Sequence, residues 1–283
     1  MTDTALASHL FDAAIALTPA GNAAPNDFHG ATHPAWQNMV GPFGGITAAT
    51  ALNAVLQHPR LLGEPVSLTV NYAAATADGP FTATARPVRT NRSTQHWIVE
   101  ITQPDAEGQP QVCTTATVFT ALRRETFSAT DMPMPAVPAP TDVARQPLPP
   151  GVAEWLHRYE LRPVSGGIPM RWEGQASAHS QTRLWLRDDP PRALDFASLA
   201  AMSDIFFPRI WLRRARRVPV GTVSMTVYFH ADGAMLAATG RGHLLGQAQA
   251  QAFHHGYFDQ TGQLWNEAGQ LLATTHQVVY FKE

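Results

Sequence analysis

SLTVNY at residues 67–72 and SMTVYF at residues 224–229 are the two stretches that decide the fold of this chain. Each alternates polar and apolar residues in the same order, which is the pattern of a β-strand with one buried face. A second pair of stretches, TTATVF at 114–119 and TTHQVV at 274–279, stands at nearly the same separation. The offsets of 157 and 160 residues indicate one duplicated unit with small insertions.

A proline-rich segment, residues 128–150, separates the two copies. It contains seven prolines, and proline lacks a backbone N–H and favours extended conformations. We interpret the segment as a linker rather than as a helix or strand. The chain therefore divides into a first half at residues 1–127, the linker, and a second half at residues 151–283.

Both halves repeat the same order of elements. An apolar stretch with helical character comes first, at 46–56 and at 194–207. Four predicted strands follow each helix, at 66–73, 80–90, 94–102 and 111–121 in the first half, and at 221–230, 234–246, 248–259 and 270–282 in the second. Turn residues before the last strand predict a hairpin in each half, at 105–109 (DAEGQ) and at 259–263 (DQTGQ) continuing to 266–270 (NEAGQ).

A long helix followed by an antiparallel meander predicts an α+β unit in which a curved sheet wraps the helix, an arrangement known as the hotdog. Two such units can pair their sheets edge to edge, which removes the exposed edge that each would have alone. The sequence therefore predicts a double hotdog of two tandem halves.

Composition narrows the class of protein further. The chain is 45% hydrophobic and 15% charged, as in globular proteins, and its formal net charge of −2 gives no field that would attract nucleic acid or an anionic membrane. The one cysteine, Cys113, cannot form an internal disulfide, which favours a reducing compartment. The sequence contains no signal peptide pattern and no apolar run of about 20 residues. We expect a cytoplasmic protein with no membrane insertion.

The second helix contains a carboxylate in an apolar setting. Asp195 falls in its first turn, where a negative charge complements the helix dipole. Asp204 falls in its last turns, against the dipole, between apolar residues such as Ala201 and Ile205. Burying an ionised carboxylate costs several kcal/mol unless partners satisfy it. We therefore interpret Asp204 as a residue with a chemical role, while the first helix offers only Asn53 and no carboxylate.

Two polar strand residues bear on the same site. Alternation in the last strand places Gln277 on the apolar face with Ala273 and Val279, so its amide needs a buried partner. Strict alternation in 221–230 puts Thr222 on the polar face, opposite Met225. Only a β-bulge would turn Thr222 towards the helix, and the sequence gives no sign of one.

These segments make the chain resemble the bacterial acyl-CoA thioesterase II family, over about residues 43–281. MSDIFF, GTVSMTVYFH and ATTHQ are similar to the family segments that contribute an Asp, a Thr and a Gln to the hydrolytic water. The resemblance implies a double hotdog that hydrolyses acyl-CoA, with Asp204, Thr222 and Gln277 as catalytic residues and no cofactor. It also implies a monomer or a homo-oligomer.

Two further features fit an acyl-CoA substrate. GPFGG at 41–45 opens the first helix, and the backbone N–H of Gly45 is our candidate donor to the oxyanion. RRARR follows the second helix and supplies candidate ligands for the CoA phosphates, Arg213, Arg214, Arg216 and Arg217. This cluster is too short and isolated to predict nucleic-acid binding.

Other functions remain open at this stage. A double hotdog that binds acyl-CoA without turnover is the non-enzyme alternative, since Ser224 and Met225 replace a charged or His residue usual in the family. A hotdog hydratase would need a histidine paired with the carboxylate, and no histidine shares the helix of Asp204. Because no group of histidines, cysteines or carboxylates has ligand spacing, we expect no metal site.

Overall fold

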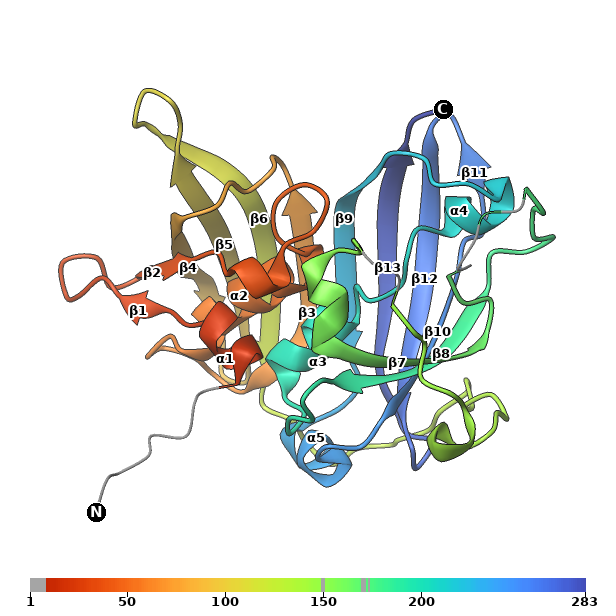
Figure 1. The fold of residues 1–283 in the computed structure, drawn as a ribbon. Helices are drawn as coiled ribbons and strands as arrows, with labels where there is room; N and C mark the ends of the chain where they lie inside the picture. The colour runs from red at the N-terminus through yellow and green to blue at the C-terminus, as the bar shows by residue number, and fades with distance from the viewer. Residues whose placement is uncertain (1–8, 149–150, 169–171, 173) are drawn as a thin grey trace, which may run out of the picture.

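A computed structural model describes residues 9–148, 151–168, 172 and 174–283. One antiparallel sheet of 13 strands curves around two central helices (Figure 1). Its strands run in the order β1-β2-β4-β5-β6-β3-β9-β13-β12-β10-β8-β7, with β11 paired to β12. The first predicted half begins in residues 1–8 and the predicted linker ends in residues 149–150, and both stretches lie outside the described residues.

The first half forms one end of this sheet. Its helices are α1 (Leu10–Ala14), η1 (Pro34–Trp36) and α2 (Gly44–Leu56). Its strands are β1 (Thr18–Pro19), β2 (Asp27–Ala31), β3 (Glu64–Tyr72), β4 (Pro80–Thr90), β5 (Thr94–Pro104) and β6 (Pro110–Ala121). The predicted helix and the four predicted strands of this half are confirmed, and β1 and β2 extend the sheet at its edge.

The second half forms the other end. Its helices are η3 (Glu154–Arg158), α3 (Phe196–Met202), α4 (Arg209–Arg214) and α5 (Gly233–Thr239). Its strands are β7 (Tyr159–Ser165), β8 (Thr182–Asp188), β9 (Val220–Phe229), β10 (Leu244–Gln249), β11 (Phe253–His254), β12 (Tyr257–Asn266) and β13 (Leu271–Phe281).

The two duplicated hexamers lie side by side at the junction of the halves. β3 pairs with β9 in the antiparallel sense, and Thr69 lies directly opposite Thr226. These two residues are 157 positions apart, the offset of the repeat, and their hydroxyl oxygens are 3.0 Å apart. A residue can face its own duplicate across an antiparallel pair only at a twofold axis. The duplication is therefore also a pseudo-symmetry of the fold.

The alignment of the second pair of stretches was wrong by one residue. Leu68 pairs with Val118, and its duplicate Met225 pairs with Gln277. The offset between β6 and β13 is therefore 159 residues, not 160. Because side chains alternate between faces, the predicted offset would have matched buried positions of one strand with exposed positions of the other.

Three predicted features of the second half differ in the structure. Residues 234–246 form α5 and the start of β10 instead of a strand, because the side chain of Asp232 caps a run of good helix formers. Residues 248–259 span the end of β10, β11 and the start of β12. The predicted turn at 259–263 lies inside β12, and only 266–270 forms the hairpin.

The predicted helix at 194–207 is shorter than expected. Asp195 is its N-cap, and the Asp195 side chain accepts a hydrogen bond of 2.8 Å from the backbone N–H of Ser198. α3 ends at Met202, and a turn leads to α4. All seven residues of α3 are buried, as its apolar sequence predicted.

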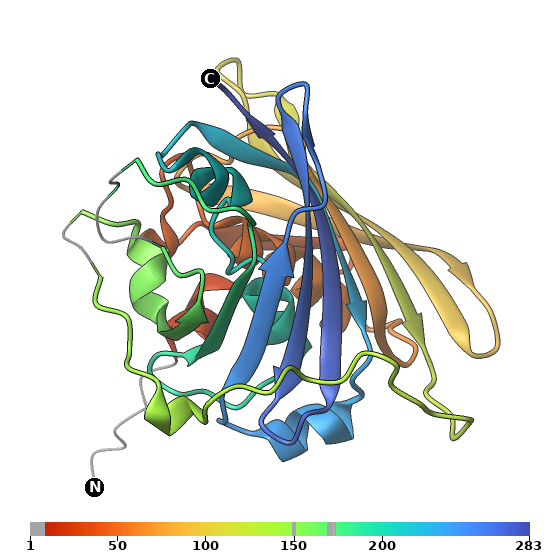
Figure 2. The same ribbon diagram turned by 90° about the vertical axis from the view of Figure 1, so that its right-hand side faces the viewer.

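The linker contains no α-helix or β-strand among its described residues. It crosses the outer face of the second half of the sheet (Figure 2). There it packs Met134 and Val137 against a cluster that contains Trp185 and Trp265. The indole N–H of Trp185 donates a hydrogen bond of 2.9 Å to the carbonyl of Pro138. The linker thus covers apolar surface on the outer face of the sheet.

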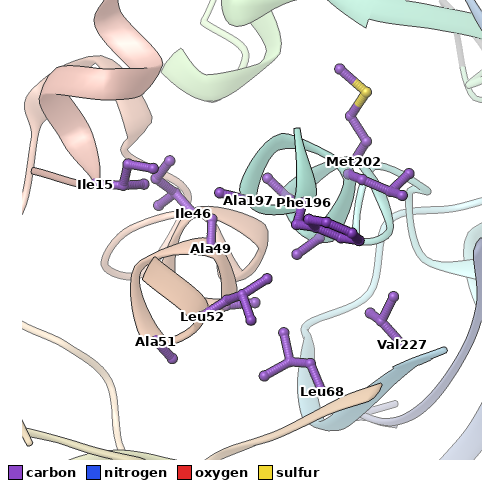
Figure 3. Close-up of a cluster of buried hydrophobic side chains, with 14 of the residues drawn as sticks. Ile15, Ile46, Ala49, Ala51, Leu52, Leu68, Phe196, Ala197, Met202 and Val227 are labelled. Atoms are coloured by element: carbon purple, nitrogen blue, oxygen red, sulfur yellow. The ribbon is translucent and has the colours of Figure 1, made fainter. Parts of the chain in front are cut away.

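The main core lies between the two central helices and the inner face of the sheet. Ile46, Ala49 and Leu52 of α2 face Phe196 and Ala197 of α3, with Leu68 and Val227 below them (Figure 3). Small alanines let the two helices approach closely, one from each half. This packing brings the C-terminal end of α3 beside the N-terminal end of α2.

Candidate active site

Asp204 lies just beyond α3, in a turn where its backbone N–H donates to the carbonyl of Ala201. Its half-buried carboxylate points to the N-terminus of α2, in the other half of the chain. A Cβ on Gly44 would lie 2.7 Å from Asp204 Oδ2, and a Cβ on Gly45 would lie 2.5 Å from the carbonyl oxygen of Ala201. The two glycines therefore leave the space that the carboxylate and the helix end occupy.

The surroundings of this carboxylate set its proton affinity. Burial raises the pKa of Asp204 from 3.8 to about 7. Hydrogen bonds from the side chain of Gln277 and from the backbone N–H of Gly45 act in the opposite direction and lower the pKa. The positive end of the α2 dipole also favours the ionised form. Asp204 is thus a carboxylate that both holds and releases a proton near neutral pH.

Gln277 has the buried partner that its position in β13 required. Its Nε2 donates a hydrogen bond of 2.9 Å to Asp204 Oδ1, and the side chain is 3% exposed. The same nitrogen lies 3.4 Å from the sulfur of Met225. The prediction that Gln277 faces the core is confirmed, and its partner is the carboxylate of the second half.

Thr222 faces the same way because β9 contains a bulge. Thr222 pairs with Val279 and Ser224 pairs with Val278, so Val223 has no residue opposite it in β13. The extra residue puts Thr222 on the face of Met225 and Gln277, and leaves Val223 40% exposed. Strict alternation placed Thr222 on the opposite face, and that prediction was wrong. The duplicate strand β3 skips Val66 in the same way.

Asp204, Thr222 and Gln277 all line one cavity of about 230 Å³. Most of its wall is apolar and includes Phe43, Trp155, Leu161, Phe206, Trp211 and Phe258. No histidine lines the cavity among the described residues. A polar cluster at one point of an apolar cavity suits a substrate with one reactive group and a hydrophobic body.

Gly45 and most of the four predicted arginines do not line this cavity. The N–H of Gly45 serves the carboxylate of Asp204, so its role as an oxyanion donor stays a prediction. Among the arginines only Arg217 lines the cavity, with its guanidinium 5.8 Å from the centre of the Trp211 ring.

The remaining three arginines have partners outside the cavity. Arg213 donates to the carbonyl of Ala178, 2.8 Å away, while Arg214 and Arg216 pair with the carboxylate of Glu283. Binding of the CoA phosphates by these side chains stays a prediction.

Gln260 is a further polar residue of the cavity that the sequence did not reveal. It lies directly opposite Gln277 in β12, lines the cavity and is 1% exposed. Its Nε2 is buried without a hydrogen-bond partner among the described residues. The sequence analysis missed Gln260 because it assigned residues 259–263 to a turn. Only as a residue of strand β12 does Gln260 pair with Gln277.

The first half lacks the polar residues of this site. By strand register, Val118 stands where the second half has Gln277, and Pro65 where it has Thr222. Asn53 of α2 donates instead to the backbone carbonyl of Ile15, 2.7 Å away, so it has a structural partner. The pseudo-symmetric position is therefore not a second copy of the site.

Comparison with known families decides the identity of the chain. Residues 32–121 match the acyl-CoA thioesterase N-terminal domain, and residues 133–281 match the acyl-CoA thioesterase C-terminal domain. The chain belongs to the acyl-CoA thioesterase family. The two matches follow each other along the chain with a gap at residues 122–132, and the second match includes residues 133–150 of the predicted linker.

Solved structures confirm the double hotdog fold of this family member. A conserved hotdog protein of unknown function from Alicyclobacillus acidocaldarius is 47% identical, with 98% of this chain and 99% of that chain covered and a TM-score of 0.89. A putative thioesterase II from Thermobifida fusca is 18% identical, with 98% and 99% covered and a TM-score of 0.79. An acyl-CoA thioesterase II from Mycobacterium marinum is 18% identical, with 96% and 98% covered and a TM-score of 0.75. No curated protein matches the chain.

Two features are absent from the described residues of this thioesterase family member. No helix there is long and apolar enough to cross a membrane. No group of three or more His, Cys, Asp or Glu side chains there could hold a metal ion.

Proposed function

We propose that the protein hydrolyses acyl-CoA thioesters with a water molecule held between Asp204, Thr222 and Gln277. The observation that carries the proposal is the half-buried carboxylate of Asp204, bonded to Gln277 in a mostly apolar cavity. A fold needs no such carboxylate for packing, and a hydrolase needs a base near neutral pH.

In the proposed reaction, ionised Asp204 takes a proton from the water while the water oxygen attacks the thioester carbon. The C=O pair moves to oxygen and forms a tetrahedral oxyanion. When the pair returns, the C–S bond breaks, and Asp204 gives its proton to the sulfur of the departing CoA. The products are a free acid and CoA thiol, with no covalent enzyme intermediate.

The other groups of the cavity have matching roles in this proposal. Thr222 and Gln277 hold the water by hydrogen bonds, which fixes its direction of attack. The unpaired amide of Gln260, beside Gln277, is a candidate donor to the thioester oxygen, together with the predicted donor Gly45. Arg217 at the cavity wall is our candidate for contact with CoA phosphate, because its fork of donors suits that anion.

The test is release of free thiol from acyl-CoAs by purified protein. We expect turnover by the natural protein and a loss of at least about 10²-fold in Asp204→Asn, which keeps the shape of the side chain but removes the base. Asp195→Asn is the matched control, since Asp195 caps α3 and pairs with Arg192, and it does not line the cavity. Equal turnover in Asp204→Asn would exclude the mechanism, and tight acyl-CoA binding without thiol release would favour the binding protein.

A further inference from the structure

Phe206 is the aromatic residue of the cavity wall that lies nearest to Asp204 in the sequence. It follows Asp204 by two residues, in the turn between α3 and α4, and is 6% exposed. The same turn therefore positions the candidate base and one wall of the substrate cavity. Any movement of this ring changes the space beside the reacting group.

The ring of Phe206 rests on two glycines of the sheet. Gly246 in β10 and Gly262 in β12 both lie on the inner face. A Cβ on Gly246 would lie 2.9 Å from Phe206 Cζ, and a Cβ on Gly262 would lie 3.1 Å from Phe206 Cε2. A side chain at Gly246 would push the ring away from the sheet, and one at Gly262 would crowd both the ring and Thr275 Cγ2, 2.8 Å from the added Cβ. Glycine inside a strand weakens it and marks a close approach, here the approach of this ring.

The cavity that this ring bounds is small. Its volume is about 230 Å³, below the roughly 300–1,000 Å³ of common ligand pockets. The thioester group takes part of that volume, so a short acyl chain fills the rest.

We infer that Phe206, seated on Gly246 and Gly262, closes the acyl end of the cavity and restricts the substrate to short acyl chains. The inference rests on the proposed function for the identity of the substrate. Removing the ring frees the space that it fills above the two glycines. Longer acyl chains then fit.

Binding of non-hydrolysable S-alkyl-CoA thioethers tests the inference without relying on turnover. Calorimetry with S-hexyl-CoA and S-dodecyl-CoA gives the ratio of their dissociation constants for each variant. We expect the natural protein to prefer the hexyl ligand, and Phe206→Leu and Phe206→Ala to shift the ratio towards the dodecyl ligand by at least about tenfold. Phe206→Leu is the milder change, used in case Phe206→Ala unfolds.

Phe196→Leu is the matched control. Phe196 is also a buried phenylalanine of this half, but its ring packs in the main core at 5.6 Å from that of Phe229. We expect its ratio to equal that of the natural protein. The opposite change, Gly246→Ala, pushes the Phe206 ring into the cavity and should weaken binding of S-hexyl-CoA more than that of S-ethyl-CoA.

Each outcome has a distinct meaning. A folded Phe206→Leu variant with an unchanged ratio overturns the inference, as does a natural protein that binds the dodecyl ligand more tightly than the hexyl ligand. Failure of the proposed function appears separately, as thioether binding with the expected ratios but no thiol release from hexanoyl-CoA.

Discussion

The ionised carboxylate of Asp204 lowers the stability of the fold, because its surroundings favour the protonated form. The raised pKa, about 7 against 3.8 in the unfolded chain, measures that cost. Between these two pH values the folded state holds more protons than the unfolded state. Stability therefore falls as the pH rises from about 4 to about 7, and levels off above that range.

Asp204→Asn removes this dependence. We expect the variant to be more stable than the natural protein at pH 8 by roughly 1–3 kcal/mol, and equally stable near pH 4. Urea unfolding at the two pH values measures the difference. Asp195→Asn is the control, and it should lose a little stability because it keeps the helix cap but removes the charge that pairs with Arg192. Destabilisation of Asp204→Asn at pH 8 would contradict the cost that we assign to the carboxylate.

The pH dependence of turnover follows from the same residue. If Asp204 acts as the base, kcat/KM rises with pH and reaches half of its plateau near pH 7. Gln277→Leu removes a hydrogen bond that lowers this pKa, so the midpoint should move to higher pH while the plateau falls about tenfold or more. Thr222→Val should lower the plateau and leave the midpoint in place. A pH–rate profile of each variant decides between these effects, and an unmoved midpoint in Gln277→Leu would count against the role of Asp204.

At the scale of the element, β9 shows how one extra residue re-aims a side chain. Without a bulge, the buried Met225 would put Val223 inside and Thr222 outside. With the bulge at Val223, Thr222 enters the cavity. The same irregularity at Val66 in β3 accompanies no polar site, so the bulge belongs to the duplicated fold and the site makes use of it.

Thiol labelling tests the bulge. In a Cys113→Ala background, Val223→Cys should react quickly, whether or not S-hexyl-CoA is bound. Thr222→Cys should react slowly, and ligand at about ten times its Kd should slow it by roughly a further tenfold, by mass action. A regular strand would give the reverse result, with a protected thiol at 223 and an accessible one at 222.

The contact between α2 and α3 is the second feature at the scale of the element. α3 alone would end with a carboxylate at the negative end of its dipole. α2, from the other half, supplies the N-terminus and two glycines against which that carboxylate lies. The N-terminus of α2 thus stabilises the carboxylate that follows α3. The site therefore needs residues from both halves of the chain.

At the scale of the whole molecule, duplication has been followed by specialisation. The twofold axis between Thr69 and Thr226 relates two similar frameworks. Only the second framework has the Asp–Thr–Gln set, while the first has Pro65 and Val118 in the matching strands. The first half instead contributes the N-terminus of α2 and, through Asn38, Met39 and Phe43, part of the cavity wall.

The local sequence by itself determined the repeat, the linker, the strands of the first half and the buried face of Gln277. These features depend on short-range patterns, namely the alternation of polar and apolar residues, the proline content and the apolar helical stretches. It also pointed to Asp204 and Gln277, since a carboxylate and an amide among apolar residues are visible in a single segment. The resemblance to the thioesterase family added Thr222, against the alternation of its own strand.

Only the tertiary structure decided which groups meet. The bulge that turns Thr222, the contact of Asp204 with Gly44 and Gly45, and the place of Gln260 beside Gln277 all depend on segments distant in sequence. α5 is different, because its alanine, methionine and leucine residues and the Asp232 cap are local helix signals that the strand prediction overlooked. Pairing register and helix contacts are properties of the folded chain, and no window of local sequence contains them.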